Sequence, residues 1–143
     1  NKNGNAPTLA GYLKQKGKVQ QKIIAYLRSL PTHLDMEVDG KRFYMVHGFP
    51  GDNVHDEVWT RPTMESENPI PGCRLIIGHT KVLSMIQPEE KRINHALDLE
   101  NRGEHLNILH APGFINLDCG CGYDMPIKAL ACLRLEDFQE FYT

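Results

Sequence analysis

Two short segments of strand-forming residues, each ending at a histidine beside a glycine, constrain the fold of this chain most. The segment "RFYMVHG" places His47 before Gly48, and "RLIIGHT" places His79 after Gly78. Apolar and aromatic runs of this length, bounded by glycine, are typical of buried strands. In α/β proteins ligands bind where strands end and loops begin, because side chains there project from a rigid base. The pattern therefore predicts an α/β fold with an imidazole at the tip of each of two strands.

The rest of the chain alternates helical and extended patterns. Apolar residues recur at helical spacing from Val19 to Leu30, and Pro31 ends that helix. In "MEVDGKRFYMVHG" the pair Asp39-Gly40 predicts a hairpin turn, because both positions tolerate positive φ. We further expect a long ordered loop over 49–72, a strand over 75–77, helix fragments over 80–103, a hairpin of 106–109 with 114–117, and a strand over 129–135 before a charged tail. No repeat or linker interrupts this order, so it predicts one α/β unit over residues 1–143.

Composition limits the classes of partner. The chain has 143 residues, 41% of them hydrophobic and 24% charged, with a formal net charge of −2. This charge provides no footprint for a nucleic acid polymer or an anionic membrane, and no apolar run approaches the roughly 18 residues of a membrane span. Four cysteines at irregular spacing argue against a disulfide framework and favour a reducing compartment. We therefore expect a cytoplasmic protein that binds neither nucleic acid nor membrane.

The two strand-end histidines are candidate metal ligands. A neutral imidazole suits a divalent metal, whereas a single histidine in such a place more often caps its strand with a hydrogen bond. Two imidazoles are too few for a catalytic metal, which usually takes three or more protein ligands. In "EVWTRP", Arg61 can fork onto two phosphate oxygens, although an ordinary surface arginine has the same sequence signature.

A Cys-x-Cys pair in "NLDCGCGYD" raises the alternative of a zinc site at Cys119 and Cys121. The spacing is tighter than the usual two-residue gap, and Cys73 and Cys132 have no matching partner motif. Buried thiols that pack as small hydrophobic groups are the preferred interpretation. The remaining histidines show no ligand spacing and are expected at the surface or in packing roles: His33, His55, His95, His105 and His110.

Taken in order, the segments "FYMVHGFPGD", "VWTRP", "RLIIGHT", "GFINLDCGCGY" and "ALACLRLED" resemble the second half of a calcineurin-like metallophosphoesterase. The bacterial serine/threonine protein phosphatases are the most similar group. The opening "NKNGNAPTL" resembles the segment that follows the central motif of that family, so the resemblance covers nearly the whole chain. It implies the C-terminal half of an α/β/β/α sandwich, with a mixed sheet and flanking helices.

The resemblance also implies a chemistry. Members of the family hold two divalent metal ions, Mn or Fe/Zn, between two sheets, and a hydroxide activated by both metals attacks the phosphorus. Carried over by motif, His47 and His79 would be ligands of the second metal and Arg61 would hold the phosphate. The glycine-rich turn after Asp118 would line the site. The substrate would be phosphorylated, either a phosphoprotein or a nucleotide.

The sequence departs from the family where the other half of the site should be. The Asp-x-His pair, the Gly-Asp-x-x-Asp-Arg-Gly loop and the Gly-Asn-His-Glu turn do not occur in it, and these supply the first metal's ligands and the catalytic histidine. "GDNVHDE" follows His47 in the wrong order, so Asp52 and His55 receive no role. Together with a start at Asn1, this predicts a C-terminal portion of the phosphoesterase domain that lacks the N-terminal metal-binding half and contains no catalytic residue.

Such a portion is expected to be inactive alone. The apolar inner face of its sheet would be open to water, which favours self-association, because buried apolar area contributes about 25 cal/mol per Å². Two other functions stay open: a dinucleoside tetraphosphate hydrolase of the same superfamily, and a non-catalytic interaction module. Retention of His47, Arg61 and His79 together argues against the module.

Overall fold

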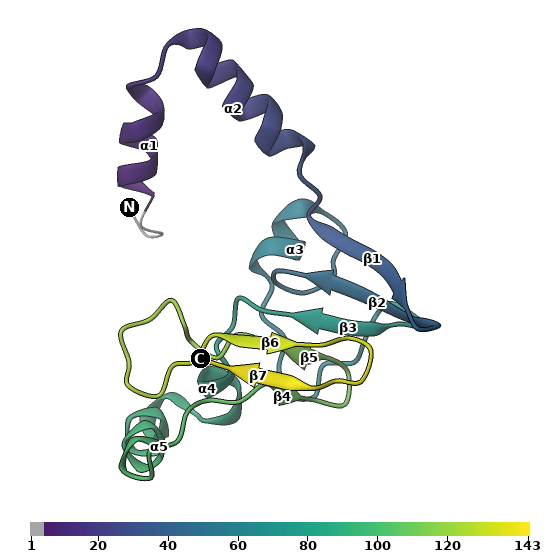
Figure 1. The fold of residues 1–143 in the computed structure, drawn as a ribbon, viewed down its shortest axis with the longest axis vertical. Coiled ribbons are helices and arrows are strands. Elements are labelled where there is room, and N and C mark those ends of the chain that lie inside the picture. The colour runs from purple at the N-terminus through teal and green to yellow at the C-terminus, as the bar shows by residue number, and fades with distance from the viewer. Residues whose placement is uncertain (1–4) are drawn as a thin grey trace. The chain divides into compact units, whose positions relative to one another are not determined.

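A computed structural model describes residues 5–143, which fall into two units with the division between Pro31 and Thr32. The first four residues of "NKNGNAPTL" lie outside the described residues. The first unit contains α1 (Ala6–Leu13) and α2 (Gly17–Ser29), shown in Figure 1. The predicted helix that Pro31 ends is thereby confirmed.

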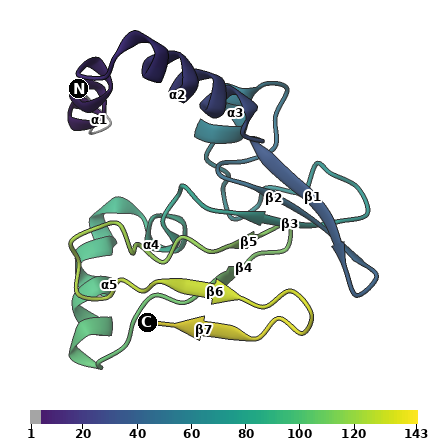
Figure 2. The same ribbon diagram turned by 45° about the horizontal axis from the view of Figure 1, so that its top comes forward.

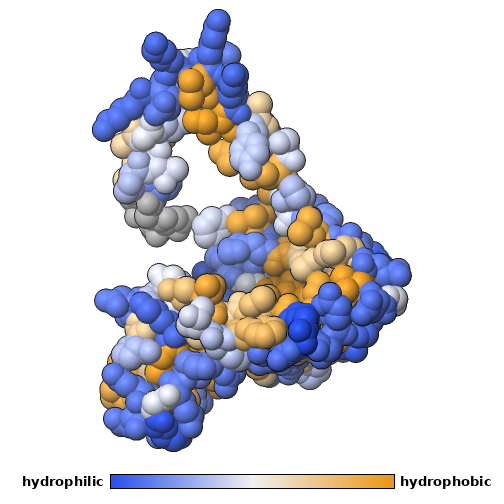
Figure 3. All heavy atoms as spheres, in the orientation of Figure 1, coloured by the Kyte–Doolittle hydropathy of each residue, from blue (hydrophilic) through white to orange (hydrophobic). Residues whose placement is uncertain are grey.

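Neither helix of the first unit buries a residue. Apolar side chains such as Leu9, Leu13 and Leu27 are more than half exposed, and an apolar stripe follows α2 in Figure 3. Helices this short gain little stability from propensity alone, since most helical stability in proteins comes from packing of an apolar face.

The second unit is built on a mixed five-stranded sheet (Figures 1 and 2). Its strands follow the order β1 (His33–Val38), β2 (Lys41–Val46), β3 (Arg74–Ile77), β5 (Ile115–Asn116) and β4 (Leu109–His110). The outer pairs β1–β2 and β4–β5 are antiparallel, whereas β2–β3 and β3–β5 are parallel. Both predicted hairpins are confirmed, and Asp39 and Gly40 have φ of 48° and 70° at the first turn.

The central strands are buried on both faces. Phe43 and Ile76 belong to one core cluster, while Tyr44, Leu75 and Ile77 belong to the other, as the period of two in a strand requires. The expectation of an apolar inner face open to water is therefore wrong for these strands. The loop segment before β3 and the β6–β7 region supply covering residues instead, such as Phe49 and Ile70 on one face and Leu133 and Tyr142 on the other. Exposed apolar side chains on this sheet include Leu34 and Met36 of the edge strand β1.

Three helices connect the strands of the second unit: α3 (Val54–Trp59), α4 (Val82–Ile86) and α5 (Glu89–Asn101). The predicted helix fragments over 80–103 are confirmed as α4 and α5, and Gly103 follows them with φ of 67°. The prediction of loop throughout 49–72 is wrong at α3. Asn53 caps this helix by accepting a hydrogen bond from the Asp56 N–H at 3.1 Å, and six residues are too few to show a helical period.

The C-terminal segment forms a second, two-stranded sheet of β6 (Ala131–Leu133) and β7 (Glu140–Tyr142). The charged tail expected after 135 is therefore wrong at β7. The charges of Arg134 and Asp137 pair across the connecting turn, with the Arg134 guanidinium donating to the carboxylate at 2.7 Å. Among the helices of residues 5–143, none has the length and apolarity that crossing a membrane would need.

Candidate functional site

The parallel strands β2, β3 and β5 end at the same edge of the sheet, because parallel strands share their direction. The residues that follow them there are His47, His79 and Asp118. The imidazole rings of His47 and His79 have centroids 4.9 Å apart and planes inclined by 58°. The structure thus brings together the two histidines that the sequence singled out.

Backbone contacts fix the turn that carries His79. The Gly78 N–H donates to the His47 carbonyl oxygen at 3.0 Å, which links the two strand ends directly. His79 itself has a φ of 60°, a left-handed conformation that is uncommon for a residue with a Cβ atom. On the far side, the fully buried Asn116 donates through Nδ2 to the Thr80 carbonyl oxygen at 2.7 Å. The same amide accepts at Oδ1 from the Asp118 N–H at 2.9 Å.

The surroundings of His79 disfavour its protonated form. Burial lowers the pKa of this imidazole, and the neighbouring Arg61 and His47 lower it further, against a smaller opposing effect of Asp118. Its Nε2 atom is buried and has no hydrogen-bond partner among the described residues. A buried polar atom without a partner is costly and needs an explanation. A neutral imidazole nitrogen that no protein group satisfies is the form that binds a metal ion.

The end of α3 brings two further side chains to this corner. The indole of Trp59 meets the His79 ring edge-on, with centroids 5.4 Å apart and planes at 87°. Arg61 lies two residues further along and donates from Nη1 to the Thr80 hydroxyl at 3.4 Å. The exposed Arg61, the predicted phosphate-binding residue, therefore lies beside the His79 turn.

The glycine-rich turn after β5 closes the edge through backbone contacts. Asp118 accepts from the Gly120 N–H at 3.0 Å, and its carbonyl oxygen accepts from the Val82 N–H at 2.9 Å. Cys119 is buried, and burial together with the nearby Asp118 raises the pKa of its thiol to about 11, whereas Cys121 is exposed. Over residues 5–143 no group of three or more His, Cys, Asp or Glu side chains is placed to hold a metal ion, which gives a zinc scaffold at these thiols no support.

Two buried polar residues near the site, Asn116 and Glu57, were missed from the sequence. Asn116 reads as an ordinary strand residue, and only its position two residues before Asp118 in "INLD" hints at a turn. Glu57 reads as a surface acid, yet it is one of the buried polar residues of the chain. Glu57 has no sequence signal that distinguishes it from its neighbours.

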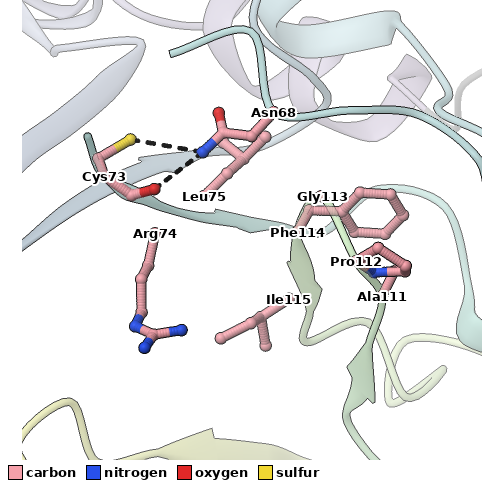
Figure 4. Close-up of a pocket in the computed structure, with 9 residues that line it drawn as sticks. All are labelled: Asn68, Cys73, Arg74, Leu75, Ala111, Pro112, Gly113, Phe114 and Ile115. Atoms are coloured by element: carbon pink, nitrogen blue, oxygen red, sulfur yellow. Dashed lines mark hydrogen bonds between the residues drawn. The ribbon is translucent and has the colours of Figure 1, made fainter. Parts of the chain in front are cut away.

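A pocket of about 290 Å³ lies at the opposite end of β3, around Arg74 and Leu75 (Figure 4). Two of its lining residues are hydrogen-bonded to each other: Asn68 donates through Nδ2 to the Cys73 carbonyl oxygen at 2.9 Å. The Arg74 guanidinium lies over the ring of Phe138, 4.9 Å from its centroid. This pocket is separate from the histidine pair.

Comparisons of the chain with protein-family models, with curated proteins and with solved structures give no match.

Proposed function

We propose that this chain is the C-terminal portion of a metal-dependent phosphoesterase of the serine/threonine protein phosphatase type. The observation that carries the proposal is the buried, unpartnered Nε2 of His79 beside the ring of His47. The resemblance of the ordered motifs to the calcineurin-like family supplies the reaction class.

The residues fit one part of a metal site. His47 and His79 would contribute imidazole ligands, and the described residues provide no third acidic, thiol or imidazole ligand around them. Bound divalent metals would supply Lewis-acid charge at the phosphoryl group and lower the pKa of water. We propose that the remaining ligands come from the N-terminal half of the domain.

The other residues would bind and orient the phosphate. The Arg61 guanidinium is free to fork onto two phosphate oxygens while its contact to Thr80 is long, at 3.4 Å. Asn116 and the Gly78 contact to His47 hold the His79 turn rigid, which matters because a site must be kept within fractions of an ångström of its productive geometry.

The test is metal binding by the 143-residue chain, measured by equilibrium dialysis with Co²⁺ and with Mn²⁺. We expect weak binding that His79→Ala removes, because two imidazoles form only part of a ligand set. Asp52→Ala is the matched control, since this exposed acid lies in the neighbouring loop and receives no role. Binding that survives in His79→Ala would contradict the ligand assignment.

Activity provides the second test. With Mn²⁺ present, we expect the chain alone not to hydrolyse p-nitrophenyl phosphate, and the coding sequence upstream of Asn1 to contain the missing aspartate and asparagine motifs. Appreciable turnover by the chain alone would show that the site is complete without them.

A further inference from the structure

Glu57 is a buried carboxylate with a convergent set of donors. Its side chain accepts from the Tyr44 hydroxyl at 2.9 Å and from the Thr32 hydroxyl, and His33 Nδ1 lies 2.9 Å from Oε1. The His33 ring stacks on Tyr44 with centroids 4.6 Å apart. Burial of a carboxylate is unfavourable unless it is paired and hydrogen-bonded, so this cluster satisfies Glu57 from β1, β2 and the residue before β1.

The hydrogen bonds of this cluster favour the ionised form of Glu57. Burial opposes ionisation of Glu57, but the hydrogen bonds from Thr32 and Tyr44 and the proximity of His33 outweigh it and lower the pKa of the carboxyl group. Burial and the bond to Glu57 raise the pKa of Tyr44 to about 12, so its hydroxyl stays a donor. The carboxylate therefore ties α3 to the β1–β2 hairpin at neutral pH.

The main chain of Glu57 connects the same residue to the metal-ligand candidates. Its carbonyl oxygen accepts from the Gly48 N–H at 2.7 Å, directly after His47. A Cβ atom at Gly48 would lie only 2.9 Å from that oxygen, so the two backbones are in close contact. Two residues beyond Glu57, Trp59 contacts the ring of His79.

We propose that Glu57 is a positioning residue of the histidine site: its carboxylate anchors α3, and α3 holds His47 through Gly48 and His79 through Trp59. A simpler role, filling space under α3, would not need an acid, because an apolar side chain of similar volume avoids the desolvation of a charge. The claim that Glu57 positions metal ligands rests on the proposed function. The claim that it positions the rings of His47 and His79 does not.

The experiment uses the only tryptophan of the chain as its reporter. Nuclear Overhauser contacts between the Trp59 indole and the His79 ring measure the positioning without any metal, and Co²⁺ titration of Trp59 fluorescence measures metal binding separately. We expect Glu57→Gln to weaken the Trp59–His79 contact and to raise the Kd for Co²⁺ by about tenfold, as loss of a group supporting a metal ligand typically does.

Three further variants separate positioning from general stability. Glu65→Gln makes the same chemical change at an exposed acid of the following loop and should leave both signals unchanged. Ile127→Val should lower stability through the core cluster that contains Phe43 and Ile76, and it should also leave the Trp59–His79 contact intact. If Glu57→Gln fails to fold, Tyr44→Phe removes one donor while keeping the carboxylate, and it should weaken the contact in the same direction.

The outcomes distinguish the two proposals. A weakened Trp59–His79 contact without Co²⁺ binding by any variant supports positioning and contradicts the metal site. An unchanged contact in a folded Glu57→Gln protein, or loss of the contact in Ile127→Val as well, overturns the positioning role.

Discussion

The two ends of strand β3 differ in how their polar groups are satisfied. At the start of the strand, Asn68 and Cys73 bond to each other around a pocket of about 290 Å³. At its end, no described group satisfies the buried Nε2 of His79. The pocket therefore contains a hydrogen-bonded amide, whereas the candidate site contains an unsatisfied imidazole nitrogen. The proposed ligand site is therefore marked by an unsatisfied nitrogen rather than by a cavity.

The strongest test of this comparison removes the His79 imidazole at the end of β3 and, in a separate variant, the Cys73 thiol near its start. We expect His79→Ala to weaken Co²⁺ binding by more than the roughly 10–100-fold that is typical for loss of a supporting group, because a ligand itself is lost. Cys73→Ala should leave the Kd unchanged. Equal effects in equilibrium dialysis would mean that the two ends do not differ.

Close backbone packing at the histidine end gives the next largest effect. We expect Gly48→Ala to lower the free energy of unfolding by about 1–3 kcal/mol, because its Cβ would lie 2.9 Å from the Glu57 carbonyl oxygen. Gly122→Ala is the control, since a Cβ there meets nothing within 4 Å. Urea unfolding of both proteins measures the difference, and equal midpoints would argue against the close contact.

The arginines at the two ends provide a smaller contrast. In the enzyme assembled with its proposed N-terminal half, Arg61→Ala should weaken inhibition by inorganic phosphate about tenfold, in the range for loss of a charged hydrogen bond. Arg74→Ala, at the pocket end, should not change the inhibition constant. A phosphate effect in Arg74→Ala alone would move the anion site to the pocket.

Acid stability gives the smallest effect. The pKa of Glu57 lies below its ordinary value of 4.5 in the folded chain, so the unfolded chain takes up this proton first as the pH falls. The stabilisation is fully present above pH 4.5 and is lost as the pH falls through the lower folded-state pKa. The free energy of unfolding, measured with urea between pH 5 and pH 3, should therefore depend less on pH in Glu57→Gln. In Glu65→Gln its pH dependence should stay unchanged. If the free energy of unfolding has the same pH dependence in both variants, the pKa of Glu57 is not lowered by folding.

Local patterns predicted the strands and the histidine at the end of two of them, whereas the mixed sheet and the joint role of His47 and His79 were expected from the family resemblance. Asp39-Gly40 specifies its turn through backbone freedom, and the apolar run before Gly78 specifies a buried strand; both are properties of neighbouring residues. The expected open sheet face was wrong because covering residues such as Phe49 and Tyr142 come from distant segments. Strand β7 was missed for the same reason, since its three residues are defined by pairing with β6.

The supporting residues of the site could not be predicted for a related physical reason. Glu57 is satisfied by Thr32, 25 positions away, and Asn116 by Thr80, 36 positions away. No local sequence signal reports such contacts. The metal, the reaction and the missing ligands remain predictions that the experiments above address.

The left-handed backbone of His79 has an energetic consequence of its own. With φ at 60°, a residue with a Cβ atom pays about 1–2 kcal/mol that glycine would not. His79→Gly and His79→Ala lose the same imidazole, yet the glycine variant should be more stable than the alanine variant by about 1 kcal/mol. That difference would measure the backbone strain that the fold sustains to keep a side chain at position 79, where glycine would be unstrained. It would be a stability–function trade-off confined to one residue.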